Sequence, residues 1–276
     1  MYIISIVNWV ILLQSQKLDP EENLKIEECI LNLSFRPFAG ILRLWQNKPC
    51  VIIGKFQKEE YEVNIPYAKN KGIPIIRRIT GGGTVYHDLG NLNITFCKRR
   101  DDFIFSNYFF EEARGITGII SRAIEDLVKE DIEIDKRNAI FLNRKKVLGS
   151  SIAITNEKFF YHASLLVNSD LTELKKVIKW EESYPDETRN FVKSNRSEVV
   201  NLSNFSKNIS VEKIKKSIIT KFEKELKTKK NVSLIEFKEL EVLRLGRERG
   251  FPPLENTLLD QIRLLLPPER SGAQGS

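Results

Sequence analysis

Three short segments of this 276-residue chain bring glycines, cations and histidines together. The first, residues 77–91, reads RRITGGGTVYHDLGN. Its three consecutive glycines permit positive φ angles, and successive backbone N–H groups in such a turn can form an anion-binding nest. The two arginines before them add positive charge suited to phosphate or carboxylate. The segment therefore predicts an anion site, and the simpler alternative is a flexible connection between two strands.

The second and third segments each centre on one residue that could take part in catalysis. Residues 145–151 read KKVLGSS, and Lys146 on a strand could point its ammonium group into a cleft. There it would hold a carboxylate or phosphate and stabilise charge that develops during acyl transfer, whereas the alternative is a surface lysine at a hairpin. Residues 160–166 contain His162, and the other histidine of the chain is His87 in the glycine segment. The simpler interpretation of His162 is a half-buried structural histidine.

The elements that would position these residues follow from apolar periodicity and turn residues. Asp19 can cap a helix that begins at Pro20, and Gly72 ends another helix. Strands are expected at 7–14, 41–45, 51–53, 73–78, 91–97, 139–142, 146–154 and 159–167. The helix that Gly72 ends is expected at 67–71, and further helices are expected at 109–128 and 170–178. Because several strands follow one another without a crossover helix, the pattern favours an α+β fold with a mixed, largely antiparallel sheet flanked by helices.

The last quarter of the chain differs in character. Residues 207–230 contain nine Lys and three Glu, hence six of the seven net positive charges, and carry an apolar helical stripe. A surface helix with a solvated lysine face is the simpler interpretation, and a docking face for an acidic partner is the alternative. Residues 254–266 predict a short helix, and residues 271–276 are expected to be disordered. We therefore expect a catalytic domain over 1–230 and a short helical C-terminal extension with a disordered tail over 231–276.

Composition excludes several classes of protein. An apolar fraction of 41% and a charged fraction of 29% exclude a disordered chain, a collagen-like repeat and a multispanning membrane protein. The net charge of +7 fits an anionic partner without identifying it. Cys29, Cys50 and Cys97 lack metal-ligand spacing, which favours a reducing, cytoplasmic location. The apolar residues 1–13 are too short for a bilayer span of about 20 residues, so no membrane partner is expected.

These motifs carry a family resemblance. The pattern at 77–91 resembles the signature of lipoate–protein ligases and lipoyltransferases. The run Lys-x-x-Gly-Ser-Ser at 146–151 resembles their Lys-x-Ser-Gly-Ser-Ala element, and Tyr-His-Ala-Ser-Leu-Leu at 161–166 resembles their His-His-Gly-Thr-Leu-Leu element. Residues 42–57 are similar to the early strand pair of the family, and Glu27-Glu28 to the acidic pair in its first helix. The resemblance covers roughly residues 8–205, in order.

The resemblance implies a biotin/lipoate ligase-like fold and a two-step activity. The family activates lipoate with ATP to lipoyl-AMP and transfers the lipoyl group to a lysine of a lipoyl domain or of the glycine-cleavage H protein. ATP is expected as its Mg²⁺ complex, with no bound prosthetic group. Lys146 would hold the lipoyl carbonyl and the phosphate as the catalytic residue. The residues that would contact the nucleotide or line the pocket are Arg78, Gly81, Gly82, Gly83, Thr84, Val85, Tyr86, His87 and His162.

The chain departs from the family pattern in three respects. An Asp associated with magnesium usually precedes the lysine strand, but the matching pair here is Asn138-Ala139, and Asp135 is out of register, so the metal ligands are unknown. Ala163 stands where the family usually has Gly. The residues after Lys230 match the accessory C-terminal domain of many ligases poorly. A separate accessory ligase subunit is therefore a possible partner.

Three functions stay open from the sequence. The leading one is an ATP-dependent lipoate–protein ligase. The second is a lipoyl or octanoyl transferase without its own adenylation step; no Cys lies between 98 and 276, which argues against a thioester mechanism but leaves a lysine-only amidotransferase. The third is a non-catalytic binding module, supported only by the lysine-rich helix. Without an aromatic stacking platform or a helix-turn-helix pattern, nucleic acid is not the expected partner.

Overall fold

The computed structural model describes residues 9–33, 39–102, 104–106, 108–180 and 191–237. The strands in this part of the chain are β1 Trp9–Gln14, β2 Gly40–Trp45, β3 Cys50–Ile53, β4 Ile75–Arg77, β5 Val85–His87, β6 Asn91–Arg99, β7 Ile132–Ile134, β8 Ile140–Leu142, β9 Lys145–Ile154, β10 Lys158–Leu166 and β11 Ser233–Phe237. The α-helices are α1 Pro20–Asn32, α2 Glu59–Glu62, α3 Ile65–Lys71, α4 Phe109–Glu125, α5 Leu171–Val177 and α6 Val211–Lys230. The predicted strands and helices within this part therefore form, with small changes at their ends.

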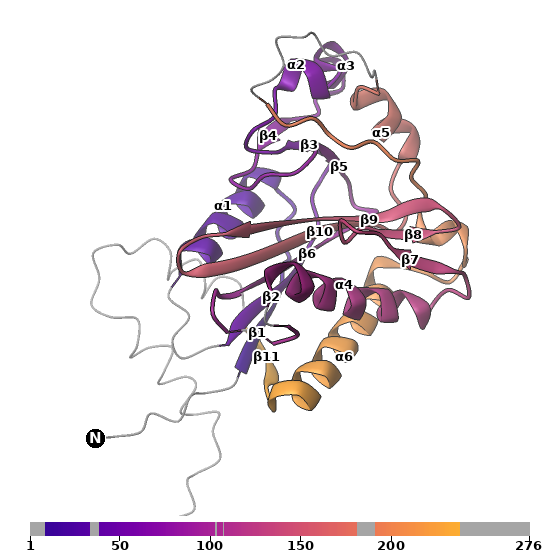
Figure 1. Ribbon diagram of the computed structural model, residues 1–276. Helices are drawn as coiled ribbons and strands as arrows, with labels where there is room; N and C mark the ends of the chain where they lie inside the picture. Colours follow the sequence, from indigo (N-terminus) through magenta and orange to yellow (C-terminus); the bar gives the residue numbers. More distant parts are fainter. Residues whose placement is uncertain (1–8, 34–38, 103, 107, 181–190, 238–276) are drawn as a thin grey trace, which may run out of the picture.

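Two sheets organise the fold (Figure 1). The large sheet has the strand order β11-β1-β2-β6-β10-β9-β8-β7, and the small sheet has the order β4-β3-β5. In the large sheet only the pairs β1–β11 and β1–β2 are parallel. The small sheet has one parallel and one antiparallel pair. The predicted α+β fold with a mixed, largely antiparallel sheet is therefore confirmed.

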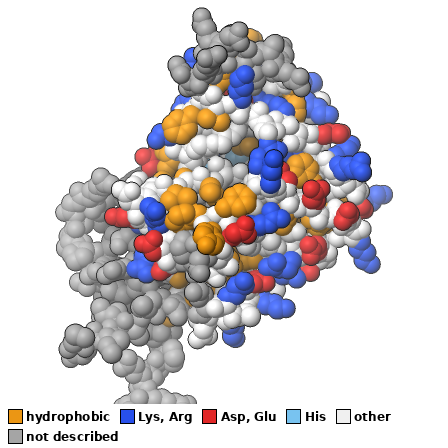
Figure 2. Space-filling model, viewed as in Figure 1, with side chains coloured by type: hydrophobic (Ala, Val, Ile, Leu, Met, Phe, Trp, Pro, Cys, Tyr) orange, Lys and Arg blue, Asp and Glu red, His pale blue; other side chains and the backbone are white. Residues whose placement is uncertain are grey.

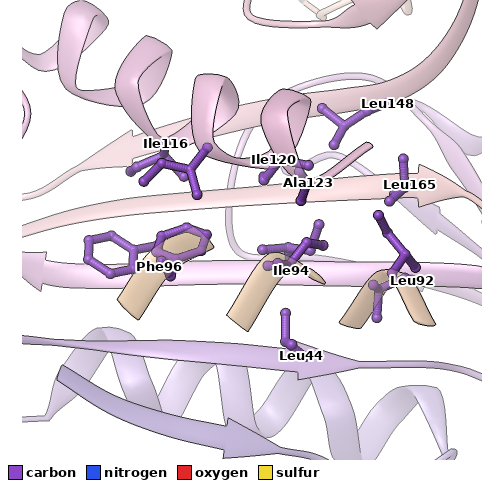
Figure 3. Close-up of a cluster of buried hydrophobic side chains, with 14 of the residues drawn as sticks. Leu44, Leu92, Ile94, Phe96, Ile116, Ile120, Ala123, Leu148 and Leu165 are labelled. Atoms are coloured by element: carbon purple, nitrogen blue, oxygen red, sulfur yellow. The ribbon is translucent and has the colours of Figure 1, made fainter. Parts of the chain in front are cut away.

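Helices α4 and α6 cover one face of the large sheet (Figure 1). Apolar side chains of α4 meet those of β6, β9 and β10 in the main core, which Figure 3 draws around Phe96, Ile94 and Ile120. The stripe expected on the lysine-rich helix is buried against the same core, with Ile214 and Phe222 fully inaccessible. Because α6 packs through this stripe, most of its lysines lie on the outer, solvated face. No helix of the described residues is long and apolar enough to cross a membrane.

Helix ends follow the capping residues in the sequence. The side chain of Asp19 accepts a hydrogen bond from the backbone N–H of Glu22 at the start of α1. Helix α3 ends at Gly72, whose φ of 64° is left-handed, as the sequence predicts. These caps fix the ends of α1 and α3 beside the two sheets.

The C-terminal extension begins with an element that the sequence analysis did not predict. Its first described element is a strand, β11, and not a helix. β11 pairs in parallel with β1, because its residues supply a partner for the strand edge that β1 would otherwise expose. The described start of the extension is thus part of the large sheet. The helix expected at 254–266 and the tail at 271–276 lie outside the described residues.

Candidate functional site

A cavity of about 530 Å³ lies between the two sheets. Strands β2, β6, β9 and β10 form its floor, the small sheet and the glycine segment form its roof, and α1 closes one end. Figure 2 shows a hollow between the upper and lower parts of the molecule, with histidine atoms visible inside it. The fold therefore brings all three sequence segments to one cavity.

Eight of the ten site residues expected from the sequence line this cavity: Arg78, Gly82, Gly83, Thr84, Val85, His87, Lys146 and His162. Gly81 and Tyr86 are not on its wall. Tyr86 lies between Val85 and His87 on β5, so the alternation of the strand turns it away, into a cluster with Val51 and Leu174. It borders a second cavity of about 100 Å³, which shares Thr84, Val85, Lys146 and Gly149 with the first.

Arg78 organises the glycine loop. Its Nε and Nη2 donate to the carbonyl of Gly81 at 3.1 and 2.7 Å, and Nη2 also donates to the carbonyl of Gly83 at 2.8 Å. Burial lowers the pKa of Arg78 to about 10, which leaves the guanidinium charged at neutral pH. Gly82 has a φ of 95°, and a Cβ there would lie 2.8 Å from Arg78 Nη2. The loop thus depends on a glycine and on an arginine that binds its carbonyl groups.

Lys146 extends into the junction of the two cavities. Burial lowers its pKa, the nearby charge of Arg137 lowers it further, and Asp135 partly opposes both. Its neighbour Lys145 is exposed and pairs with Glu198 at 2.7 Å. A half-buried ammonium group beside two cavities is suited to hold an anionic ligand and to stabilise a developing oxyanion.

His87 is buried, His162 is half-buried, and both are neutral. Burial, followed by the charge of Arg78, lowers the pKa of both His87 and His162 to about 3. His162 Nε2 lies 3.0 Å from Thr80 Oγ1, and His87 Nδ1 lies 3.1 Å from Asn47 Nδ2. At physiological pH neither ring is an imidazolium cation, so neither can act as an imidazolium acid.

Part of the cavity wall is apolar, although Glu21, Lys25, Glu27 and Glu28 of α1 also line the cavity. Trp45, Leu24, Ile52 and Phe160 contribute to its wall. The indole Nε1 of Trp45 donates to Thr95 Oγ1 at 3.0 Å, and this hydroxyl donates to Glu27 Oε2 at 2.7 Å. The hydrogen bonds fix the orientation of the indole, so the wall is an ordered apolar surface of a size that suits an alkyl chain.

The residues before the lysine strand do not form a magnesium site. Asp135 Oδ1 accepts hydrogen bonds from the backbone N–H groups of Arg137 and Ala139, and Oδ2 pairs with the Arg137 side chain. Ala139, at the position where the family carries Asp, lines the cavity with a methyl group. Within the described ranges no group of three or more His, Cys, Asp or Glu could hold a metal ion. Among the residues that the structure describes, the donor set therefore does not fit a metal held by the protein.

Sequence reasoning missed a segment that crosses the cavity, residues 192–196. The carboxylate of Glu62 accepts the backbone N–H and the hydroxyl of Ser194, and pairs with Arg196. Ser194 Oγ in turn accepts the backbone N–H of Thr84 at 2.8 Å and the side-chain amide of Gln57 at 2.9 Å. The polar run KSNRS at 193–197 was a visible signal, but its partners lie more than 100 residues away in the chain.

Comparisons with known sequences match this chain to one family of proteins. The family model of the lipoyl protein ligase A/B catalytic domain matches residues 19–223. Lipoate-protein ligase A subunit 1 of Thermoplasma acidophilum is 36% identical over 194 residues, which are 67% of this chain and 72% of that protein. Lipoate-protein ligase LplJ of Bacillus subtilis is 35% identical over 68% of this chain, which spans only 54% of LplJ. The human mitochondrial lipoyl amidotransferase LIPT1 is 33% identical over 61% of this chain and 44% of its own length.

Solved structures are similar over most of the chain. A Thermoplasma acidophilum protein with bound lipoic acid matches with a TM-score of 0.69 and 26% identity, covering 88% of this chain and 94% of its own. The bipartite lipoate protein ligase of the same organism, studied with its E2 lipoyl domain, matches with a TM-score of 0.68 and 27% identity over 88% and 91% of the two chains. A lipoate-protein ligase A bound with ATP matches with a TM-score of 0.66 and 27% identity over 88% and 93%.

Proposed function

This chain belongs to the lipoyl protein ligase A/B catalytic-domain family, and from that premise we propose that it is a lipoate–protein ligase. It activates lipoate with ATP to lipoyl-AMP and then transfers the lipoyl group to a lysine of an acceptor lipoyl domain or glycine-cleavage H protein. The observation that carries the proposal is the position of Lys146 at the junction of two cavities, one of which has a long apolar wall.

The two cavities suit the two halves of lipoyl-AMP. The apolar wall around Trp45 fits the lipoyl chain, with its carboxylate directed towards Lys146. The smaller cavity, bordered by Tyr86, Ile178 and Trp180, has room for only part of the nucleotide, which we assign to this side together with the adjoining end of the larger cavity. Its flat aromatic lining and the backbone of residues 84–86 agree with the expectation that this segment contacts the nucleotide. Similar proteins have been solved with lipoic acid and with ATP, which supports these two ligands as substrates.

In the first step, a carboxylate oxygen of lipoate attacks the α-phosphorus of ATP, and the bond to pyrophosphate breaks. The Lys146 ammonium attracts both anions to one place and offsets the charge that gathers on the phosphate oxygens. Arg78 holds the glycine loop in shape beside them. Because the donor set does not fit a metal held by the protein, no step is assigned to one; Mg²⁺ would arrive with ATP.

In the second step, the amine of the acceptor lysine attacks the acyl carbon, and the bond to AMP breaks as the amide forms. The carbonyl oxygen becomes an oxyanion, which Lys146 stabilises by charge and hydrogen bonding. The attacking nitrogen loses a proton, which passes to solvent water. The low pKa of His87 and His162 means that both imidazoles are neutral while this happens.

The test of Lys146 is lipoate-dependent exchange between ATP and pyrophosphate. Lys146→Ala is expected to lower the exchange rate by about 100-fold, since it removes a charge that the transition state uses. Lys145→Ala is the matched control, because this neighbour is exposed and pairs with Glu198 on the surface. Equal rates in the two variants would contradict the role of Lys146.

One observation favours a second function, transfer without adenylation. The methyl group of Ala139 lines the cavity where the family usually has a carboxylate, and the relative LIPT1 is named an amidotransferase. The two functions separate in one assay: acyl transfer to a purified lipoyl domain from lipoate plus ATP, or from lipoyl-AMP. If transfer occurs only from lipoyl-AMP, and lipoate plus ATP stays inactive after an accessory subunit is added, the chain is a transferase and not a ligase.

The proposal includes an accessory subunit as a partner. The Thermoplasma relative is named subunit 1, and a bipartite ligase from that organism has a similar structure. This chain would supply the catalytic domain, residues 1–230, and meet the second subunit through other surfaces. Activity with lipoate and ATP that appears only when such a subunit is added would support this division of labour. A cytoplasmic location remains a prediction from the cysteines.

A further inference from the structure

Strand β9 contains one extra residue beside the catalytic lysine. Neighbouring residues Ile140 and Phe141 of β8 pair with Leu148 and Lys146, so Val147 has no partner of its own in the ladder. This is a β-bulge, which breaks the alternation of faces along the strand. Val147 and Leu148 are both fully buried in the main core.

The bulge decides where Lys146 points. In a regular strand, residues three apart face opposite sides, and Lys146 would then lie opposite to Gly149. With the extra residue between them, both line the same two cavities. The backbone on this side is held by hydrogen bonds from Lys146 N–H to the carbonyl of Glu198 at 2.8 Å and from Val200 N–H to the carbonyl of Lys146 at 3.1 Å.

Gly149 lies directly under the end of the lysine. A Cβ built on Gly149 would be 3.1 Å from both Cε and Nζ of Lys146, which is tighter than ordinary van der Waals contact. No other atom is as close, and the φ of Gly149 is not in the left-handed region. The absence of a side chain therefore serves neither a turn nor core packing; it leaves room for the ammonium group.

We propose that Gly149 is a positioning residue of the reaction, which keeps the space that the Lys146 ammonium group occupies at the junction of the cavities. The inference rests on the proposed function, because it assumes that Lys146 acts on the acyl and phosphoryl groups. A methyl group at 149 would push the flexible end of Lys146 aside by a few tenths of an ångström or more. The fold tolerates this shift easily, whereas catalysis depends on the position of that atom.

The charges around Lys146 predict a second consequence. Arg137 and Asp135 face it from the segment before β8, and Lys193 and Arg196 line the same cavity from the segment that crosses it. Burial is the main cause of its lowered pKa. Displacement towards the open cavity restores hydration of the ammonium group, so its pKa rises towards the ordinary value.

The test is Gly149→Ala, assayed by transfer from lipoyl-AMP to an acceptor lipoyl domain. We expect a kcat at least about tenfold lower with little change in the KM for lipoyl-AMP, since misplacement of a reacting group costs rate more than binding. We expect wild-type activity to fall at high pH as Lys146 loses its proton, and we expect this fall to move to higher pH in the variant. The melting temperature should stay within about 2 °C of wild type, because no backbone or core atom must move.

Two further variants keep the test decisive. Gly118→Ala, on α4 with Arg122 Nη1 as its nearest neighbour at 3.4 Å, is the control and should match wild type. In a Lys146→Ala background, Gly149→Ala should have no further effect, because it acts only through the lysine. Wild-type kcat and an unmoved pH profile in Gly149→Ala, or an equal loss in the Lys146→Ala background, would overturn the inference. An inactive wild-type chain with the accessory subunit present would instead overturn the proposed function.

Discussion

Glu62, the last residue of α2, accepts a hydrogen bond from Ser194, which lies 132 residues later in the chain and lines the cavity. The carboxylate accepts both the backbone N–H and the hydroxyl of Ser194, and it is fully buried. Through the same hydroxyl, Ser194 contacts the backbone N–H of Thr84 in the glycine segment. Two walls of the cavity are therefore joined by one buried carboxylate.

Glu62→Gln should loosen this junction. An amide can keep one acceptor contact, but it loses the charge that pairs with Arg196 and leaves buried donors unsatisfied, at a cost of about 2 kcal/mol. We expect the KM for ATP to rise more than the KM for lipoate, since the segment borders the nucleotide side. Steady-state kinetics with each substrate varied in turn would measure this. Glu60→Gln on the exposed face of the same helix is the control, and an equal effect there would contradict the assignment.

Arg78→Lys should disturb the glycine loop although the charge is kept. A lysine cannot reproduce the fork of donors that reaches the carbonyl groups of Gly81 and Gly83. We expect a loss of stability of about 2 kcal/mol and a higher KM for ATP, measured by urea unfolding and by exchange kinetics. Arg99→Lys, which changes a surface pair with Asp102, should alter neither quantity by a comparable amount.

Thr95→Val should affect the apolar end of the cavity. The substitution keeps the shape but removes the hydroxyl that links Trp45 Nε1 to Glu27. Because a buried indole N–H and a buried carboxylate then lose a partner, we expect about 2 kcal/mol lower stability and weaker binding of lipoate. Thr220→Val on α6 removes only an exposed bond to its own helix and serves as the control. Unchanged lipoate affinity in Thr95→Val would refute a role of the network in orienting Trp45.

Stability should fall on mild acidification. The folded-state pKa of His87 and His162 is about 3, below the ordinary value of 6.5, so below pH 6.5 the unfolded chain binds protons that the folded chain does not. The stability is therefore fully present above pH 6.5 and decreases as the pH falls towards 3, by up to about 1.4 kcal/mol per pH unit for each histidine. Urea unfolding at pH 7.5 and 5.5 measures the slope. A variant with both His87→Gln and His162→Gln should show a much smaller slope, and the same slope as wild type would contradict buried neutral imidazoles.

Local patterns in the sequence determined most of the elements and the residues of the cavity. The caps of α1 and α3 and the buried stripe of α6 depend on residues within one or two helical turns, so they can be derived without the fold. Each motif segment by itself left a structural alternative open, and it was their joint resemblance to one family that implied a shared site. Their roles in catalysis remain predictions.

Only the tertiary structure decided how these residues face one another. The bulge at Val147 reverses the side on which Lys146 lies, and strand periodicity alone would place it opposite to Gly149. The alternation of β5 turns Tyr86 away from the larger cavity, and Arg78 uses its donors on the loop carbonyl groups. Glu62 and Ser194 meet across 132 residues, and β11 becomes a strand because β1 offers it an edge. The Glu62–Ser194 contact and the β1–β11 pair join segments far apart in the chain, and such contacts leave no periodic signal in the sequence itself.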